Sequence, residues 1–263
     1  MKSSILKRIA ALTAGIATAF AMTSCFEQES STKLTKDGSG TITETTIVGA
    51  QMAGMMKGQM GEGENDLTNE AKYKEKVARM GEGVEYVGLT TEDTADGGMK
   101  IVASYKFDDI TKLKGVMSDD ENADSMTFDF EKGDTNKLTI KLPKQPAAEK
   151  AGDKEEEKPE LTDEMKAAQK QQMQMMAGMV QGMKITMALE VDGEIVKTDA
   201  DHVDGNKITI MSVDVGKVFA NEEALEMLDS PEAMDDVETL RELSKKIDGL
   251  KIEADDTITV EFK

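Results

Sequence analysis

Strict alternation of apolar and polar residues is the feature that most constrains how this chain can fold. Apolar side chains occupy every second position from Met183 to Val191, with Lys184, Thr186 and Glu190 among the residues between them. A period of two places alternate side chains on opposite faces of a β-strand. The same pattern recurs over 99–107, 126–130, 138–142 and 258–262. Because one face of each strand would be buried and the other wet, we expect an antiparallel amphipathic sheet.

Short turn sequences separate these segments and support hairpins. The turn Asp37-Gly38-Ser39-Gly40 divides residues 33–48 into the two arms of one predicted hairpin. Further turn sequences are found at 96–98 (DGG), 192–193 (DG) and 204–206 (DGN). Asp, Asn and Gly favour turns because they tolerate the backbone angles that tight turns require.

Two Met-rich segments, 51–60 and 161–181, are predicted to be helices that cover the sheet. The methionines that lie on or beside one helical face are Met52, Met55 and Met56 in the first segment, and Met173, Met176 and Met179 in the second. Helices are also predicted over 68–80 and from Ser230 to about Gly249. The sequence therefore predicts an α+β fold, an antiparallel amphipathic sheet with Met-rich helices packed on one face.

Composition divides the chain into segments. Residues 143–160 hold three of the four prolines and many charged residues, which is typical of a flexible linker or long loop. The resulting division is a signal peptide (1–24), a lipidated tether (25–32), a first α+β half (33–142), the linker (143–160) and a second α+β half (161–263). The two halves form either one domain or two.

The N-terminal residues have the pattern of an export signal. Lys2, Lys7 and Arg8 precede a mainly apolar stretch over 9–22. A basic start, a short apolar run and small residues before a cleavage site define a secretory signal peptide. The stretch is shorter than the roughly 20 apolar residues that a membrane-spanning helix needs.

Met22-Thr23-Ser24-Cys25 follows this run and contains the only cysteine of the chain. This motif resembles the lipobox of bacterial lipoproteins. The resemblance implies that a diacylglycerol is joined to the Cys25 thiol, that cleavage occurs before Cys25 and that the membrane is a partner through this lipid. Phe26 and Glu27 follow where an Asp would favour inner-membrane retention, so the resemblance implies an outer-membrane location. The alternative is an ordinary cleaved signal with an unpaired cysteine.

Charge and composition argue against several functions. Removal of residues 1–24 removes three basic and no acidic residues, which leaves 29 Lys and Arg against 52 Asp and Glu, a net charge of −23. Such a surface repels nucleic acid. There is no Trp for stacking on sugars, and His202 is the only histidine for a catalytic triad. We therefore expect no enzymatic activity and no cofactor.

The methionines allow three interpretations. Their spacing fits core packing, because Met is a flexible core filler. It also fits an adaptable apolar groove for a ligand or partner. A third interpretation is a Cu(I) site, since thioethers are soft ligands.

The acidic cluster at 198–206 has two interpretations. Asp199, Asp201 and Asp204 could belong to a calcium loop, but Val203 stands where an oxygen ligand is needed, and Gly205 falls one position late. Solvated turn residues are the simpler interpretation.

The segments "DGSGTIT" (37–43) and "DGNKITI" (204–210) resemble segments of bacterial envelope lipoproteins of the LppM-like class. This resemblance implies a sheet-and-helix domain with an apolar cleft and provides no catalytic residues. The predicted function is therefore a non-enzymatic, lipid-anchored envelope lipoprotein that binds a protein partner or an apolar ligand. The alternatives are a structural or assembly component of the envelope and a Met-based metal-handling protein.

Overall fold

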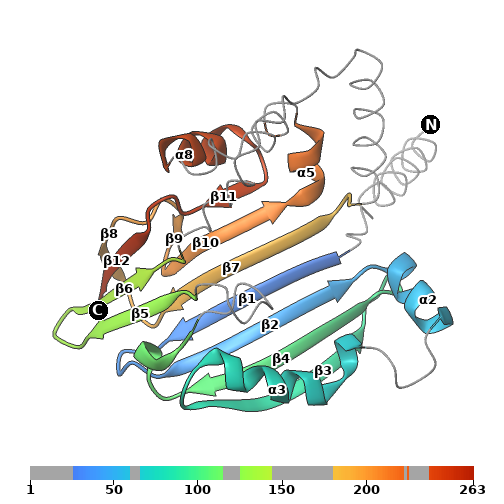
Figure 1. The fold of residues 1–263 in the computed structure, drawn as a ribbon, viewed down its shortest axis with the longest axis horizontal. Coiled ribbons are helices and arrows are strands. Elements are labelled where there is room, and N and C mark those ends of the chain that lie inside the picture. Colours follow the sequence, from blue (N-terminus) through green and yellow to red (C-terminus); the bar gives the residue numbers. More distant parts are fainter. Residues whose placement is uncertain (1–25, 60–65, 115–124, 144–179, 222–223, 225–236) are drawn as a thin grey trace, which may run out of the picture.

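A mixed sheet of eight strands forms the largest part of the computed structural model, which describes residues 26–59, 66–114, 125–143, 180–221, 224 and 237–263. Its strand order is β11-β10-β7-β1-β2-β4-β3, and β9 pairs with β10 (Figure 1). The strands are β1 (Phe26–Leu34), β2 (Gly40–Val48), β3 (Val84–Asp93), β4 (Met99–Phe107), β7 (Met183–Val191), β9 (Val203–Asp204), β10 (Lys207–Asp214) and β11 (Leu250–Ile252).

The expectation of an antiparallel sheet is wrong at one position, because β1 and β7 run parallel. Their register extends from Phe26 opposite Met183 to Leu34 opposite Val191. The other paired strands of this sheet are antiparallel. Parallel neighbours need a long connection, which the chain between β1 and β7 provides. The described fold is mostly β with few short helices.

A second sheet has four strands in the order β5-β6-β12-β8, all antiparallel. They are β5 (Thr127–Glu131), β6 (Asn136–Lys141), β8 (Ile195–Thr198) and β12 (Thr257–Phe262). Since β6 pairs with β12 and β1 pairs with β7, segments from before and after 143–160 contribute to both sheets. The division into one or two domains stays a prediction.

The helices lie around the larger sheet (Figure 1). They are α2 (Ala50–Gln59), α3 (Glu70–Met80), α5 (Val215–Ala220) and α8 (Val237–Lys246). Side-chain caps fix two of their starts: the Asn69 carbonyl oxygen accepts from the Ala71 amide, and the Asp214 carboxylate accepts from the Lys217 amide. Such caps satisfy amide groups that a helix start leaves unpaired. None of the helices in the described part of the chain is both apolar enough and long enough to span a bilayer.

Three clusters of side chains cover the inner face of the larger sheet. At the end that carries the 35–39 turn, Leu34, Phe107 and Val191 pack in one cluster with Leu138 and Phe262 of the smaller sheet. At the opposite end, α2 contributes Ala53 to a second cluster. A third cluster joins α5 and α8 to β10 and β11. The core therefore lies on one face of the larger sheet.

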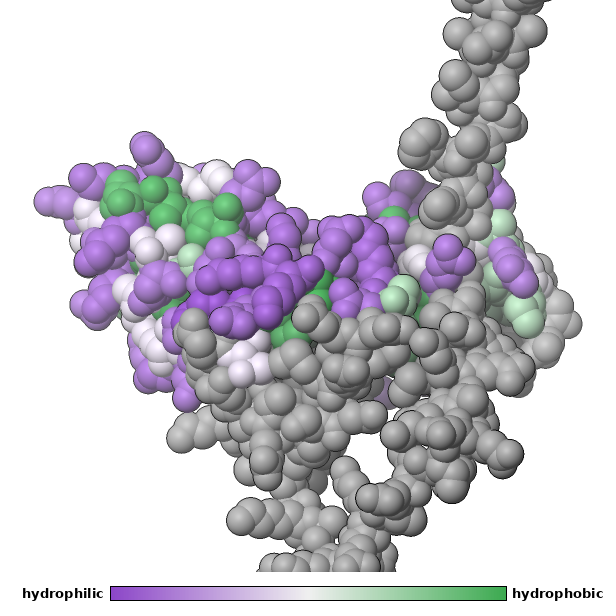
Figure 2. Space-filling model, turned by 90° about the horizontal axis from the view of Figure 1, so that it is seen from above, coloured by the Kyte–Doolittle hydropathy of each residue, from purple (hydrophilic) through white to green (hydrophobic). Residues whose placement is uncertain are grey.

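The outer face carries the alternate, polar residues of the same strands. The Lys207 ammonium of β10 reaches over β7 to the Glu29 carboxylate of β1, at 2.9 Å. On the neighbouring strands β7 and β10, the hydroxyl oxygens of Thr186 and Ser212 lie 3.1 Å apart. On the side of the molecule that Figure 2 shows from above, most of the described surface is hydrophilic, and hydrophobic residues form smaller areas. This arrangement confirms the amphipathic character that the alternation predicts.

Residues 26–32, which were expected to be a tether, form most of β1. The sequence suggests a tether because this segment, FEQESST, lacks apolar alternation. It is nevertheless an inner strand, since β2 lies on one side and β7 on the other. Its inward-facing Ser30 and Thr32 line a pocket and do not enter a dry core, so their polarity is tolerated.

Candidate functional site

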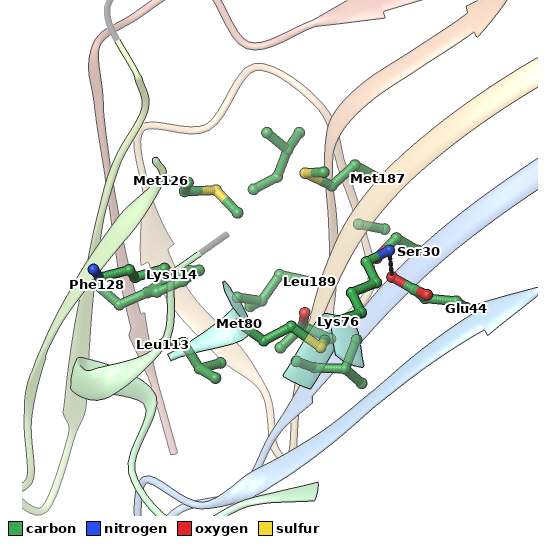
Figure 3. A pocket seen from close by; sticks show the side chains of 14 residues that line it. Ser30, Glu44, Lys76, Met80, Leu113, Lys114, Met126, Phe128, Met187 and Leu189 are labelled. Carbon is green, nitrogen blue, oxygen red and sulfur yellow. Dashed lines mark hydrogen bonds and ion pairs between the residues drawn. The ribbon is translucent and has the colours of Figure 1, made fainter. Parts of the chain in front are cut away.

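A pocket lies between the inner face of the larger sheet, helix α3 and strand β5 of the smaller sheet (Figure 3). Ser30 and Thr32 of β1 lie at its base, beside Glu44 of β2 and Met187 of β7. The strand register explains this grouping, because Ser30 is directly opposite both Glu44 and Met187. Residues from both halves of the chain therefore form one site.

Three methionines line this pocket, and we call it the methionine pocket. Met80 comes from the last turn of α3, Met126 immediately precedes β5, and Met187 belongs to β7. In Figure 3 all three side chains extend toward the space that they enclose. Met80 and Met126 are buried and Met187 is partly exposed. Unbranched thioether side chains re-pack easily, which suits them to contacts with differently shaped apolar groups.

A close backbone contact holds Met80 in place. Gly81 follows the helix with a φ of 120° and forms a bridge with Leu113. A Cβ atom at Gly81 would lie 2.2 Å from the Lys112 carbonyl oxygen, so a side chain does not fit there. The Lys114 amide then donates to the Met80 carbonyl oxygen at 2.9 Å. These contacts bring the buried Leu113 and the exposed Lys114 into the lining of the pocket.

An ion pair forms the polar side of the pocket. The Lys76 ammonium lies 2.6 Å from Oε1 of Glu44, with side-chain exposures of 22% and 12% (Figure 3). The buried Tyr105 hydroxyl donates toward the other oxygen of Glu44 at 3.5 Å. Burial, followed by the negative charge of Glu44, raises the pKa of Tyr105 far above its ordinary value, so the phenol stays protonated. The pair joins α3 to the sheet and leaves the pocket with no free charge at its base.

The methionine pocket is small. Its cavity volume is about 40 Å³. Sites that enclose a whole drug-sized molecule have volumes of roughly 300–1,000 Å³. The cavity can therefore take the end of an apolar chain or one apolar side chain, but not a whole large ligand.

The predicted groove residues that lie in the described part of the chain are not in this pocket. Met52 and Met55 are exposed on α2, and Met56 is partly buried against the cluster around Val48. Ala53 of α2 is buried in the same cluster, because its small side chain allows a close approach to the sheet. Met173, Met176 and Met179 lie outside the described residues, as does Cys25.

The acidic residues at 199–201 have structural partners. Asp199 accepts from the Thr259 amide at 2.6 Å, and Asp201 binds the Arg241 guanidinium, which also contacts Asp255. Within the described segments, no group of three or more His, Cys, Asp or Glu side chains is arranged to hold a metal ion. The carboxylates of Asp199 and Asp201 therefore connect loops to β12 and α8.

Beside them, Glu253 is a buried carboxylate. Its two oxygens accept from the amides of Asp201 and His202, each at 2.9 Å. Burial raises the pKa of Glu253 in spite of these two donors. The contact fixes the loop after β8 against the chain between β11 and β12.

The sequence contains a signal for the three methionines of this pocket, although the prediction of groove residues does not include them. Met126 and Met187 occupy inward positions of alternating segments, and Met80 ends a predicted helix. Each residue is therefore predicted to face a core. Only the pairing of distant strands brings the three together.

No protein-family model matches the chain, and no curated protein matches it. Among solved structures, the chain is similar to the folded domain of the LppM protein of Mycobacterium tuberculosis, determined by NMR, with a TM-score of 0.29, 5% sequence identity and 94% of each chain covered.

Proposed function

We propose that this protein is a non-enzymatic, lipid-anchored envelope lipoprotein that binds a small apolar group in the methionine pocket. The observation that carries the proposal is the pocket itself, with three methionines from three separate elements around one opening between the sheets. The lipid anchor rests on the resemblance of residues 22–25 to a lipobox.

The chemistry of the lining decides the class of ligand. Apart from the Lys76–Glu44 pair, the exposed Lys114 and the hydroxyls of Ser30 and Thr32, the lining is apolar. An apolar group that enters gains burial against methionine and leucine side chains without leaving a polar atom unpaired. The volume limits that group to a chain end or a side chain. A carboxylate or a hydroxyl on the same ligand would remain at the rim.

Binding of a fatty acid probe tests the proposal. The mature protein is titrated with cis-parinaric acid, whose fluorescence rises in an apolar site, and Met187→Gln is compared with Met55→Gln. Met187 lines the pocket and is partly exposed, so the variant should fold, whereas Met55 lies on the surface of α2. We expect roughly tenfold weaker binding for Met187→Gln, which corresponds to about 1.4 kcal/mol, and unchanged binding for Met55→Gln.

Two results would contradict the proposal. One is the absence of saturable binding to the unaltered protein, and the other is equal binding by both variants. A photo-cross-linker at position 187 in the native envelope addresses the alternative. One dominant protein partner would favour an assembly component in place of a ligand-binding protein.

A further inference from the structure

The start of β1 places one end of the larger sheet beside the predicted anchor. Phe26 is the first residue of β1 and follows Cys25 directly in the chain. Consecutive Cα atoms are about 3.8 Å apart. Phe26 pairs with Val48 on one side and with Met183 on the other. A lipid on Cys25 would therefore hold this end of the sheet at the membrane surface, with no tether between them.

Helix α2 lies at the same end of the sheet (Figure 1). It begins two residues after Val48, and the Ala53 amide donates to the Gly49 carbonyl oxygen at 2.9 Å. Ala53 is buried against the sheet, whereas Met52 is 39% and Met55 58% exposed. These two are the large apolar side chains that α2 leaves in contact with solvent. Exposed apolar side chains beside a lipid anchor suit insertion at a membrane interface.

Charge does not explain attraction of this end to a membrane. The charges at this end are mixed, since Glu27 lies opposite Lys184 in the strand register, and Asp96 belongs to the β3–β4 turn, in which Gly97 lies against Ala50. The whole chain has a net charge of −20. Anionic lipids attract basic segments and repel acidic ones. Contact between this end and the bilayer must therefore depend on apolar burial.

We propose that Met52 and Met55 of α2 insert into the interface of the bilayer that holds the anchor, so that the strands of the larger sheet stand upright on the membrane. The inference rests on the lipid anchor of the proposed function. Once the anchor holds the chain, insertion is an intramolecular event at high effective concentration, and two side chains are sufficient to select an orientation. Ser30 would then lie roughly 13 Å above Phe26, at about 3.3 Å per strand residue.

Depth-dependent quenching tests this orientation. Because the sulfur of Cys25 carries the lipid, an introduced cysteine provides the one free thiol. The lipidated full-length mature protein is labelled with an environment-sensitive dye at Met55→Cys or at Val196→Cys and reconstituted in phosphatidylcholine vesicles with brominated acyl chains. Val196 is 48% exposed on β8, which follows Gly193, a residue beside Lys36 in the turn at the opposite end of the sheet, and it is the matched control.

We expect several-fold stronger quenching at position 55 than at position 196, unchanged between low and high salt. Adding Met52→Glu to the variant labelled at 55 should reduce its quenching to the level of position 196. Equal quenching at both positions in protein that floats with the vesicles would overturn the orientation and leave the anchor intact. Protein that does not float, with no diacylglycerol in its intact mass, would overturn the anchor and this inference with it.

Discussion

At the residue scale, Glu44 combines two roles, because it closes one side of the methionine pocket and holds α3 on the sheet. Its partner Lys76 is mostly buried and would lose its carboxylate in Glu44→Ala. An unpaired buried charge is costly, so we expect the free energy of unfolding to fall by about 1–3 kcal/mol. Chemical denaturation measures this change.

The chain offers a matched control for that variant. Glu70 pairs with Lys74 on the same helix at 3.0 Å, but both side chains are more than half exposed. Exposed pairs contribute about 0–1 kcal/mol. Glu70→Ala should therefore change stability much less than Glu44→Ala. Equal losses would show that burial of the Glu44 pair has no special importance.

A second prediction at this scale concerns Glu253 and pH. Its folded-state pKa is raised above the ordinary value of 4.5, mainly by burial. The folded protein therefore binds this proton more readily than the unfolded chain. Its contribution to stability is fully present below pH 4.5 and is lost as the pH rises through the raised pKa. Many other acids titrate in the same range, so the contribution must be measured as a difference.

The comparison is between the protein and Glu253→Gln, each unfolded with denaturant at a series of pH values. The difference in unfolding free energy, unaltered protein minus variant, should decrease as the pH rises from 4.5. The groups that face Glu253 and could alter the slope are Asp201 and His202, with Arg241 beyond Asp201. A difference that increases with pH would contradict the burial of this carboxylate.

At the scale of the element, β12 holds the smaller sheet together. It lies between β6 and β8, and Phe262 is completely buried and stacked on Phe130 with ring centroids 6.3 Å apart. Phe262→Ala should lower the free energy of unfolding by about 3–5 kcal/mol, because the cavity cannot collapse fully. Val196→Ala on neighbouring β8 is exposed and should change it by less than about 0.5 kcal/mol. Thermal and chemical unfolding of both variants provide the measurement.

Strand β3 was not predicted from the sequence, because its apolar residues do not alternate regularly. Val84 and Tyr86 face inward, but a bulge between Tyr86 and Gly88 shifts the pattern, so that Leu89 faces inward next. The inward-facing residues therefore change from even-numbered to odd-numbered positions within the ten residues of the strand, and the sequence shows no regular alternation there. It also lies at the edge of the sheet. Bulges and charged residues such as Glu85 on edge strands hinder pairing with other chains.

At the scale of the whole molecule, the two halves of the chain are expected to hold together without a covalent link. A protease site inserted within 143–160 and then cleaved would leave two fragments. Nine residue pairs join β1 to β7 and six join β6 to β12. The fragments should co-elute in size-exclusion chromatography and separate only in denaturant. Separation without denaturant would show that the halves are independent domains.

The sequence by itself determined the local elements. Alternation predicted β4, β7 and β12, and the turn at 37–40 predicted β2 and the last two residues of β1, whose other residues were assigned to a tether. Leu243 of α8 and Ile247, which directly follows this helix, are buried as the predicted apolar stripe requires. These predictions succeed because side-chain periodicity and turn chemistry act between residues close in sequence.

The tertiary structure alone decided how these elements combine. The parallel pairing of β1 with β7 joins Phe26 to Met183 and places a polar segment in the middle of the sheet. The same pairing puts Met187 beside Ser30, and the packing of α3 and β5 adds Met80 and Met126. Such contacts depend on burial shared between distant segments. Local patterns specify which face of a strand is apolar, but not which strand lies beside it.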